Sequence, residues 1–145
     1  MESTPGLVLP AYSLYYDCPV KLVETPEGGM RAWRLSIDHG GWSAANDLID
    51  EILFAVGGEI SMVPPGEFVQ EVEKFRACYL SGNGPVFALY ATVAAITATE
   101  EKRTLTDRER ALVRGIRRKT FVMFEEQLRQ QGDPGADPTV GQADS

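Results

Sequence analysis

The chain has 145 residues and a formal net charge of −7, a size that fits one domain with a hydrophobic core. Its two cysteines and single histidine show no ligand spacing, which argues against a disulfide framework, a metal site or another cofactor site. Residues 1–10 carry neither a basic start nor a small-residue cleavage site, so we expect a cytoplasmic protein.

The first candidate element lies within residues 7–16. This stretch is rich in strand-favouring side chains and is interrupted by Pro10, a pattern that favours an edge strand or an extended arm. Tyr12, Tyr15 and Tyr16 give the arm an aromatic character, and aromatic side chains are enriched in protein interfaces. We therefore take these tyrosines as one candidate protein-binding surface, with burial in the core as the alternative.

A β-hairpin is predicted over about residues 20–37. Two runs of alternating character, 20–25 and 30–37, flank the turn sequence Pro26-Glu27-Gly28-Gly29. In the second run, Trp33 and Leu35 fall on one face of the expected strand.

After this hairpin the apolar period becomes helical. Apolar positions from Ala45 to Val56 predict a helix with Ser43 as its N-cap and Gly57-Gly58 as its end. Residues 59–63 could form a third short strand. Pro64-Pro65 then opens a second helix, which we expect to bury Phe68, Val69, Val72, Phe75, Tyr79 and Leu80 and to expose Glu67, Glu71, Glu73, Lys74 and Arg76.

The stretch at about residues 85–99 is uncharged and almost entirely apolar or small. Pro85 suits the first helical position, so the pattern predicts a helix that begins there. Because the helix is apolar on every face, we expect the rest of the fold to cover it as a central buried helix. It is too short to span a bilayer, which takes about 20 apolar residues, so no membrane is expected as a partner.

The last helix is marked by a capping box, Thr106-Asp107-Arg108-Glu109, and its pattern continues to Gly132. The remaining residues are mostly Gly, Asp, Pro, Ala and Gln, a composition typical of a disordered segment. The sequence thus predicts an α+β fold, with a small antiparallel sheet built on the hairpin followed by four helices. We expect residues 1–131 to form a single domain and residues 132–145 a flexible acidic tail.

Basic residues are concentrated at the start of the last helix. Residues 102–119 hold eight basic and two acidic side chains, so this segment is +6 and the remainder of the chain is −13. Such a split indicates internal ion pairing or a charged partner. We favour a helix that faces a protein or is paired within the chain. Binding to nucleic acid is less favoured because the other helices are acidic, and binding of an anionic ligand is the least favoured alternative. The candidate contact residues are Arg110, Arg114, Arg117 and Arg118.

Two short stretches have enzyme-like or ligand-binding character. Gly41-Trp42-Ser43-Ala44-Ala45 is similar to the nucleophile elbow of α/β-hydrolases, which would make Ser43 and His39 catalytic residues. An N-cap role for Ser43 and a turn at Gly40-Gly41 are the favoured interpretation, because neighbouring strand residues point to opposite faces. Residues 81–85 could hold a phosphate at a helix start, but a plain turn between helices is favoured.

These observations favour a non-enzymatic, acidic protein that binds another protein, such as a bacterial or phage accessory factor, an inhibitor, an immunity protein, a chaperone or a phage-assembly factor. The alternatives are a regulator that binds nucleic acid through the basic helix and a small hydrolase built around His39 and Ser43. A homo-oligomer is a further alternative for the partner.

Overall fold

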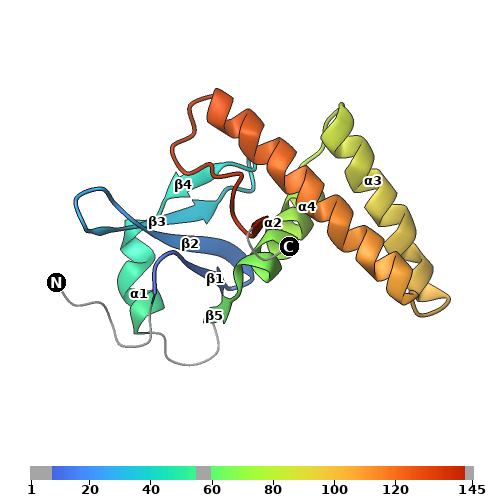
Figure 1. The fold of residues 1–145 in the computed structure, drawn as a ribbon, viewed down its shortest axis with the longest axis horizontal. Helices are drawn as coiled ribbons and strands as arrows, with labels where there is room; N and C mark the ends of the chain where they lie inside the picture. Colours follow the sequence, from blue (N-terminus) through green and yellow to red (C-terminus); the bar gives the residue numbers. More distant parts are fainter. Residues whose placement is uncertain (1–7, 55–59, 143–145) are drawn as a thin grey trace.

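A computed structural model describes residues 8–54 and 60–142. The chain forms a five-stranded antiparallel sheet with the order β4-β3-β2-β1-β5 together with several helices, which confirms the α+β class (Figure 1). The strands are β1 Ala11–Tyr15, β2 Cys18–Glu24, β3 Met30–Leu35, β4 Trp42–Ala44 and β5 Ile60–Val63. The helices are η1 Asn46–Leu48, α1 Ile49–Leu53, α2 Pro65–Tyr79, α3 Pro85–Ala98, η2 Thr99–Glu101 and α4 Asp107–Gln130.

The predicted hairpin is confirmed as β2 and β3. The two strands pair antiparallel, with Val20 opposite Arg34 and Glu24 opposite Met30. The connecting turn is closed by hydrogen bonds between Thr25 and Gly29, in which the backbone N–H of Thr25 donates to the Gly29 carbonyl over 2.9 Å. The strand expected at residues 59–63 is present as β5.

The N-terminal strand is not at the sheet edge, as residues 7–16 had suggested. β1 lies between β2 and β5 and pairs with both. Residues 8–10 are not in a strand, and Leu7 lies outside the described residues. Tyr16 and Asp17 connect β1 to β2 with φ angles of 48° and 68°, the positive values that a tight two-residue hairpin turn requires.

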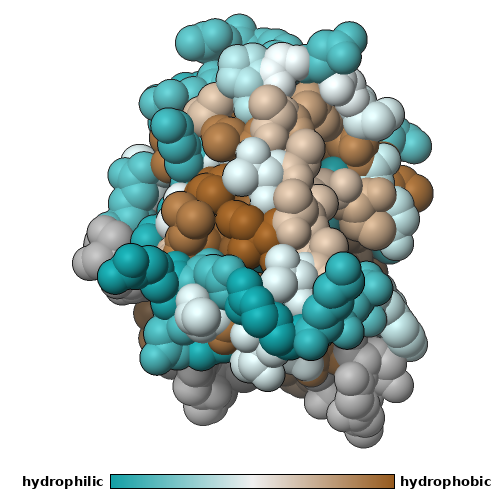
Figure 2. All heavy atoms as spheres, turned by 90° about the vertical axis from the view of Figure 1, so that its right-hand side faces the viewer, coloured by the Kyte–Doolittle hydropathy of each residue, from teal (hydrophilic) through white to brown (hydrophobic). Residues whose placement is uncertain are grey.

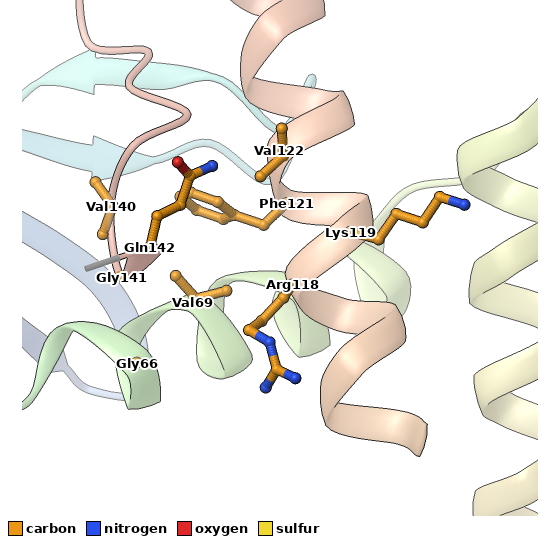
Figure 3. A pocket seen from close by; sticks show the side chains of 9 residues that line it. All are labelled: Gly66, Val69, Arg118, Lys119, Phe121, Val122, Val140, Gly141 and Gln142. Carbon is orange, nitrogen blue, oxygen red and sulfur yellow. The ribbon is translucent and has the colours of Figure 1, made fainter. Parts of the chain in front are cut away.

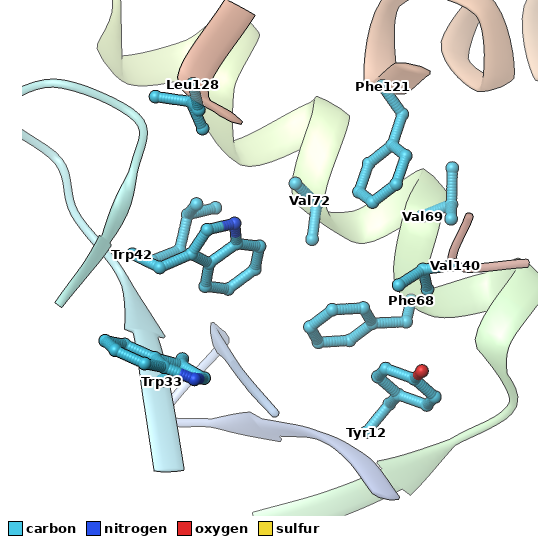
Figure 4. Close-up of a cluster of buried hydrophobic side chains, with 10 residues drawn as sticks. Tyr12, Trp33, Trp42, Phe68, Val69, Val72, Phe121, Leu128 and Val140 are labelled. Carbon is cyan, nitrogen blue, oxygen red and sulfur yellow. The ribbon is translucent and has the colours of Figure 1, made fainter. Parts of the chain in front are cut away.

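The sheet has an apolar cluster on each face. Figure 4 shows the larger one, in which aromatic side chains of the sheet meet α2 and α4; its residues include Tyr12, Trp33, Trp42, Phe68 and Phe121. The opposite face packs against η1 and α1 through Val20, Leu22, Ala32, Leu48 and Ile52. Both faces of the sheet are therefore covered.

The helix expected from Ala45 to Val56 is much shorter than predicted. Ser43 lies exposed in β4 and caps no helix, so the proposed N-cap is wrong. The physical reason is that the backbone N–H of Ala45 pairs with the Ala32 carbonyl at 2.9 Å, which keeps the chain on the sheet until Asn46. The expected end at Gly57-Gly58 lies outside the described residues.

α2 begins at Pro65 as predicted, but two of its charged residues face inward. Glu73 and Arg76 are fully buried, whereas Tyr79, predicted to be buried, is exposed. The prediction followed residue type, while the helical spacing already placed Glu73 and Arg76 beside Val69 and Val72.

α3 is a peripheral helix, and its expected central burial is wrong. It packs on α4 and lies at the far edge of the molecule from the sheet (Figure 1). Only Val86, Tyr90 and Val93 are buried among its 14 residues. The burial of α3 was inferred from its lack of charged residues, but the rest of the chain covers only one side of this helix.

α4 starts with the predicted capping box: the Thr106 hydroxyl accepts from Glu109 N, and Glu109 reaches back to Thr106 N. After α4 the chain turns back over the sheet instead of leaving the domain. Val140 is buried in the larger apolar cluster, and Gly135 lies so close to Trp42 that a Cβ there would be 2.5 Å from a Trp42 side-chain atom. The composition of residues 132–145 did not predict this docking of the described part, 132–142.

Candidate functional site

A buried network of three charged side chains lies between α2 and α4. Arg76 donates to Glu73 Oε2 over 2.9 Å and to Glu125 Oε2, and the side chains of all three residues are fully buried. The Arg76 guanidinium lies 4.1 Å from the Phe124 ring centroid. Each carboxylate therefore has a cation beside it, which a buried charge requires.

Neutral donors complete this network. Glu73 Oε1 accepts from the Tyr90 hydroxyl at 2.8 Å and from the Thr120 hydroxyl at 2.6 Å. Glu125 Oε1 accepts from the indole N–H of Trp42 at 3.1 Å and from the backbone N–H of Asp137 at 2.8 Å. Burial raises the pKa of Glu73, although Arg76 and the two hydroxyls act in the opposite direction. The network joins α2, α3, α4, β4 and the C-terminal segment.

Arg76 also fixes the turn that contains His39. Its Nε donates to the Gly40 carbonyl over 2.9 Å. Gly40 has a φ of +74°, and a Cβ there would lie 2.5 Å from Leu80 and 2.7 Å from Phe124, so only glycine fits this close approach. The network thus has a structural role that its contacts account for, because no buried polar side-chain atom of the described residues lacks a partner.

The enzyme-like residues are placed on this turn and the strand after it. His39 is exposed, and its Nδ1 accepts from the backbone N–H of Gly41 at 3.1 Å. Ser43 is exposed in β4, and no hydrogen bond joins it to His39 in the described structure. A cavity of about 230 Å³ is lined by Asp38, His39, Leu80 and Phe87, and Ser43 is not part of its lining. The structure does not bring the proposed nucleophile to the proposed base.

Of the three tyrosines of the predicted aromatic surface, Tyr15 and Tyr16 have their rings in edge contact, with the centroids 4.8 Å apart, whereas Tyr12 lies in the core. Tyr12 is buried, with its ring centroid 4.8 Å from that of Phe68. The Tyr15 hydroxyl donates to Glu51 over 2.7 Å, and this hydrogen bond raises the pKa of Tyr15 to about 12. Tyr16 is exposed at the β1–β2 turn. Tyr12 therefore does not share an exposed surface with Tyr15 and Tyr16.

The basic residues of α4 are partly neutralised within the chain. Arg110 pairs with Asp107, and Arg114 pairs with Glu67 of α2 at 2.9 Å. Arg117 is half-buried, and burial lowers its pKa. Arg118 is exposed and has neither a hydrogen bond nor an ion pair to any described residue.

The exposed side of α3 carries no charge. Its exposed residues are small, and they are Pro85, Ala88, Ala91, Thr92, Ala94, Ala95 and Ala98. Figure 2 looks onto this side of the molecule and shows a brown to pale apolar band bordered by hydrophilic residues. We call these residues the α3 face. Leu89 and Ile96 flank it and are half-buried.

Other types of site find little support among the described residues. They contain no group of three His, Cys, Asp or Glu side chains arranged to hold a metal ion. Cys18 is buried and Cys78 exposed, and both are free thiols. The part of the chain with described coordinates has no helix long and apolar enough to cross a membrane.

Sequence reasoning missed the buried network and the exposed helix face. The spacing of Glu73 and Arg76 relative to Val69 and Val72 was a usable signal for the first. For the second, no signal in the sequence distinguishes a helix covered by its own chain from one covered by a partner. No family model, curated protein or solved structure matches the chain.

Proposed function

We propose that this chain is a non-enzymatic protein-binding protein, of the accessory, inhibitor, immunity, chaperone or phage-assembly kind, and that the α3 face is its docking surface. One observation carries the proposal: a 14-residue helix without a charged side chain keeps only three residues buried. A helix on the surface of a folded protein normally carries polar or charged residues on its outer side. A contiguous exposed apolar surface commonly marks an interaction site.

The small, uncharged side chains of the α3 face indicate what kind of partner surface could pack against it. Alanines at 88, 91, 95 and 98 allow the backbone of another helix to approach closely. Because the face offers no charge, a charged group of the partner would be buried there without compensation. We therefore infer that the partner presents an apolar helix or sheet surface, with its polar groups at the rim.

This surface replaces the two surfaces that the sequence favoured. Tyr12 is part of the core, and Arg110 and Arg114 already have acidic partners. The same ion pairs reduce the positive charge that α4 offers to nucleic acid, whose binding depends on free Lys and Arg contacts to phosphate.

A charge placed on the α3 face tests the proposal. In Ala95→Glu the new carboxylate would have to be buried against the partner, and we expect partner affinity to fall at least about tenfold, which corresponds to about 1.4 kcal/mol. Ala111→Glu makes the same change at an exposed alanine of α4 and serves as the matched control. Both variants must retain the thermal unfolding midpoint of the wild type.

The readout has two arms. Sedimentation over a concentration series detects a second copy of the chain as the partner. Quantitative capture from the native host identifies proteins that wild type and Ala111→Glu retain and Ala95→Glu loses, and the purified candidate is then titrated against all three. A wild type that stays monomeric and captures nothing sensitive to Ala95→Glu would contradict the proposal.

A further inference from the structure

A second candidate site lies on the opposite side of α4 from α3. A cavity of about 270 Å³, partly open to solvent, is lined by the start of α2, the middle of α4 and the C-terminal segment. Figure 3 shows Val69, Phe121 and Val140 around it, and Gly66 and Gly141 also belong to its lining. The walls are therefore mainly apolar.

The only charged residues in the lining are basic. Arg118 and Lys119 line the cavity, and no acidic residue of the described ranges 8–54 and 60–142 does. Figure 3 shows Lys119 extending away toward α3, whereas Arg118 extends from the lower edge of the cavity. Glu67, the acidic residue next to Gly66, is paired with Arg114.

Arg118 differs from the neighbouring arginines of α4. Arg114 has an ion pair with Glu67, and Arg117 faces Gln70, but Arg118 has no hydrogen-bond or ion-pair partner among the described residues. Its guanidinium lies along α4 beside Gly115, where a Cβ would be 3.6 Å from Arg118 Nη2. Within the described part of the chain, Arg118 is thus a cation without an acidic partner at the edge of an apolar cavity.

We propose that this cavity binds a small apolar carboxylate, with its hydrocarbon part between Val69, Phe121 and Val140 and its carboxylate against Arg118. Apolar walls with one positioned charge are typical of small-molecule sites, and a guanidinium can bind a carboxylate with two parallel hydrogen bonds. This site is independent of the α3 face, so either proposal can fail alone.

The volume limits the size of the ligand. An engineered apolar cavity of about 150 Å³ holds one benzene ring. By that scale the present cavity accepts about ten non-hydrogen atoms, which corresponds to a single ring with a short acidic chain.

Binding of 3-phenylpropanoate to the full chain tests the proposal, with neutral 3-phenylpropan-1-ol as the matched ligand. We expect saturable binding that shifts the methyl resonances of Val69 and Val140, and weaker binding of the alcohol by about tenfold because it cannot pair with a guanidinium. Arg118→Gln should lower the affinity for the acid to that for the alcohol and leave the alcohol unchanged. Arg108→Gln, at another exposed arginine of α4, should change neither.

A second variant tests the cavity itself. Val122→Trp places a large ring at the half-buried cavity wall and should abolish binding of both ligands. Absence of saturable binding to the wild type overturns the site. Equal affinity for acid and alcohol overturns the role of Arg118, and shifts centred on His39 or Tyr90 overturn the location. If Val122→Trp does not fold, Arg118→Gln and the ligand pair still decide the outcome.

Discussion

The hydroxyl of Tyr90 on α3 donates a hydrogen bond to the buried carboxylate of Glu73 on α2 over 2.8 Å. α3 has no charged side chain of its own, and Tyr90 connects it to the buried ion network. The outer helix is thus fixed by one buried polar contact in addition to the packing of Val86 and Val93.

Replacing Tyr90 by phenylalanine measures the strength of that connection. Tyr90→Phe keeps the ring but removes a donor to a buried carboxylate, so we expect a loss of about 1–3 kcal/mol in the free energy of unfolding. Denaturant unfolding gives the value. Tyr79→Phe, at an exposed tyrosine of α2, is the control and should stay within about 0.5 kcal/mol of wild type. Equal effects of the two substitutions would contradict the role of the hydrogen bond.

Arg76 is the residue on which the two buried carboxylates depend. Arg76→Met leaves Glu73 and Glu125 without their shared cation, and we expect a loss of about 3–5 kcal/mol in the free energy of unfolding.

Denaturant unfolding measures this loss, and a compensating variant tests its cause. Glu73→Gln and Glu125→Gln combined with Arg76→Met remove all three charges, so the triple variant should regain stability relative to Arg76→Met. A triple variant less stable than the single one would show that packing, and not an uncompensated charge, causes the loss.

The docked C-terminal segment gives a third prediction. Val140 lies 6% exposed in the apolar cluster, and Asp133 accepts from the backbone N–H of Trp42 at 3.0 Å. Val140→Ala should lower the free energy of unfolding by about 1–2 kcal/mol through lost burial. Pro134→Ala, at an exposed position of the same segment, should have little effect. If Val140→Ala is also neutral, the segment does not contribute to the fold in solution.

Local signals in the sequence predicted the local structures well. Alternation around a Pro-Glu-Gly-Gly turn predicted β2 and β3, and Thr106 with Glu109 predicted the start of α4. These features depend on residues within a few positions of each other. The outcome at Ser43 shows the limit, since a sheet hydrogen bond from Ala45 to Ala32 prevented the helix start that Ser43 favoured.

For features that depend on distant partners, the sequence indicated at most the face of a helix and never the partner. Glu73 and Arg76 are buried because Glu125, Tyr90 and Thr120 meet them from other helices. The last segment docks because two tryptophans leave a place where Gly135 fits and one valine reaches the core. For α3, the apolar sequence predicts that the helix is buried. It does not predict whether the same chain or a partner buries it.

A buried lysine gives the last prediction. Lys21 is 2% exposed on the face of the sheet that packs against α2 and α4, and its Nζ lies 4.4 Å from the Trp42 ring centroid. Burial lowers its pKa below the ordinary value of 10.5. The charges of Glu125, Asp137 and Asp133 act in the opposite direction, and Arg76 adds to the lowering.

The lowered pKa fixes the sign of the pH dependence. Between the folded-state pKa of Lys21 and 10.5, the unfolded chain binds more protons than the folded one, so this residue makes stability rise with pH in that window. Lys21→Met keeps the apolar stem against Trp42 and removes the titration. At neutral pH the variant should therefore be more stable than wild type, and its advantage should shrink as the pH approaches 10.5. Unfolding midpoints across this range give the test, with Lys74→Met on the exposed side of α2 as the control. A Lys21→Met variant that is less stable at neutral pH would mean that the three carboxylates, and not burial, dominate the energetics of this lysine.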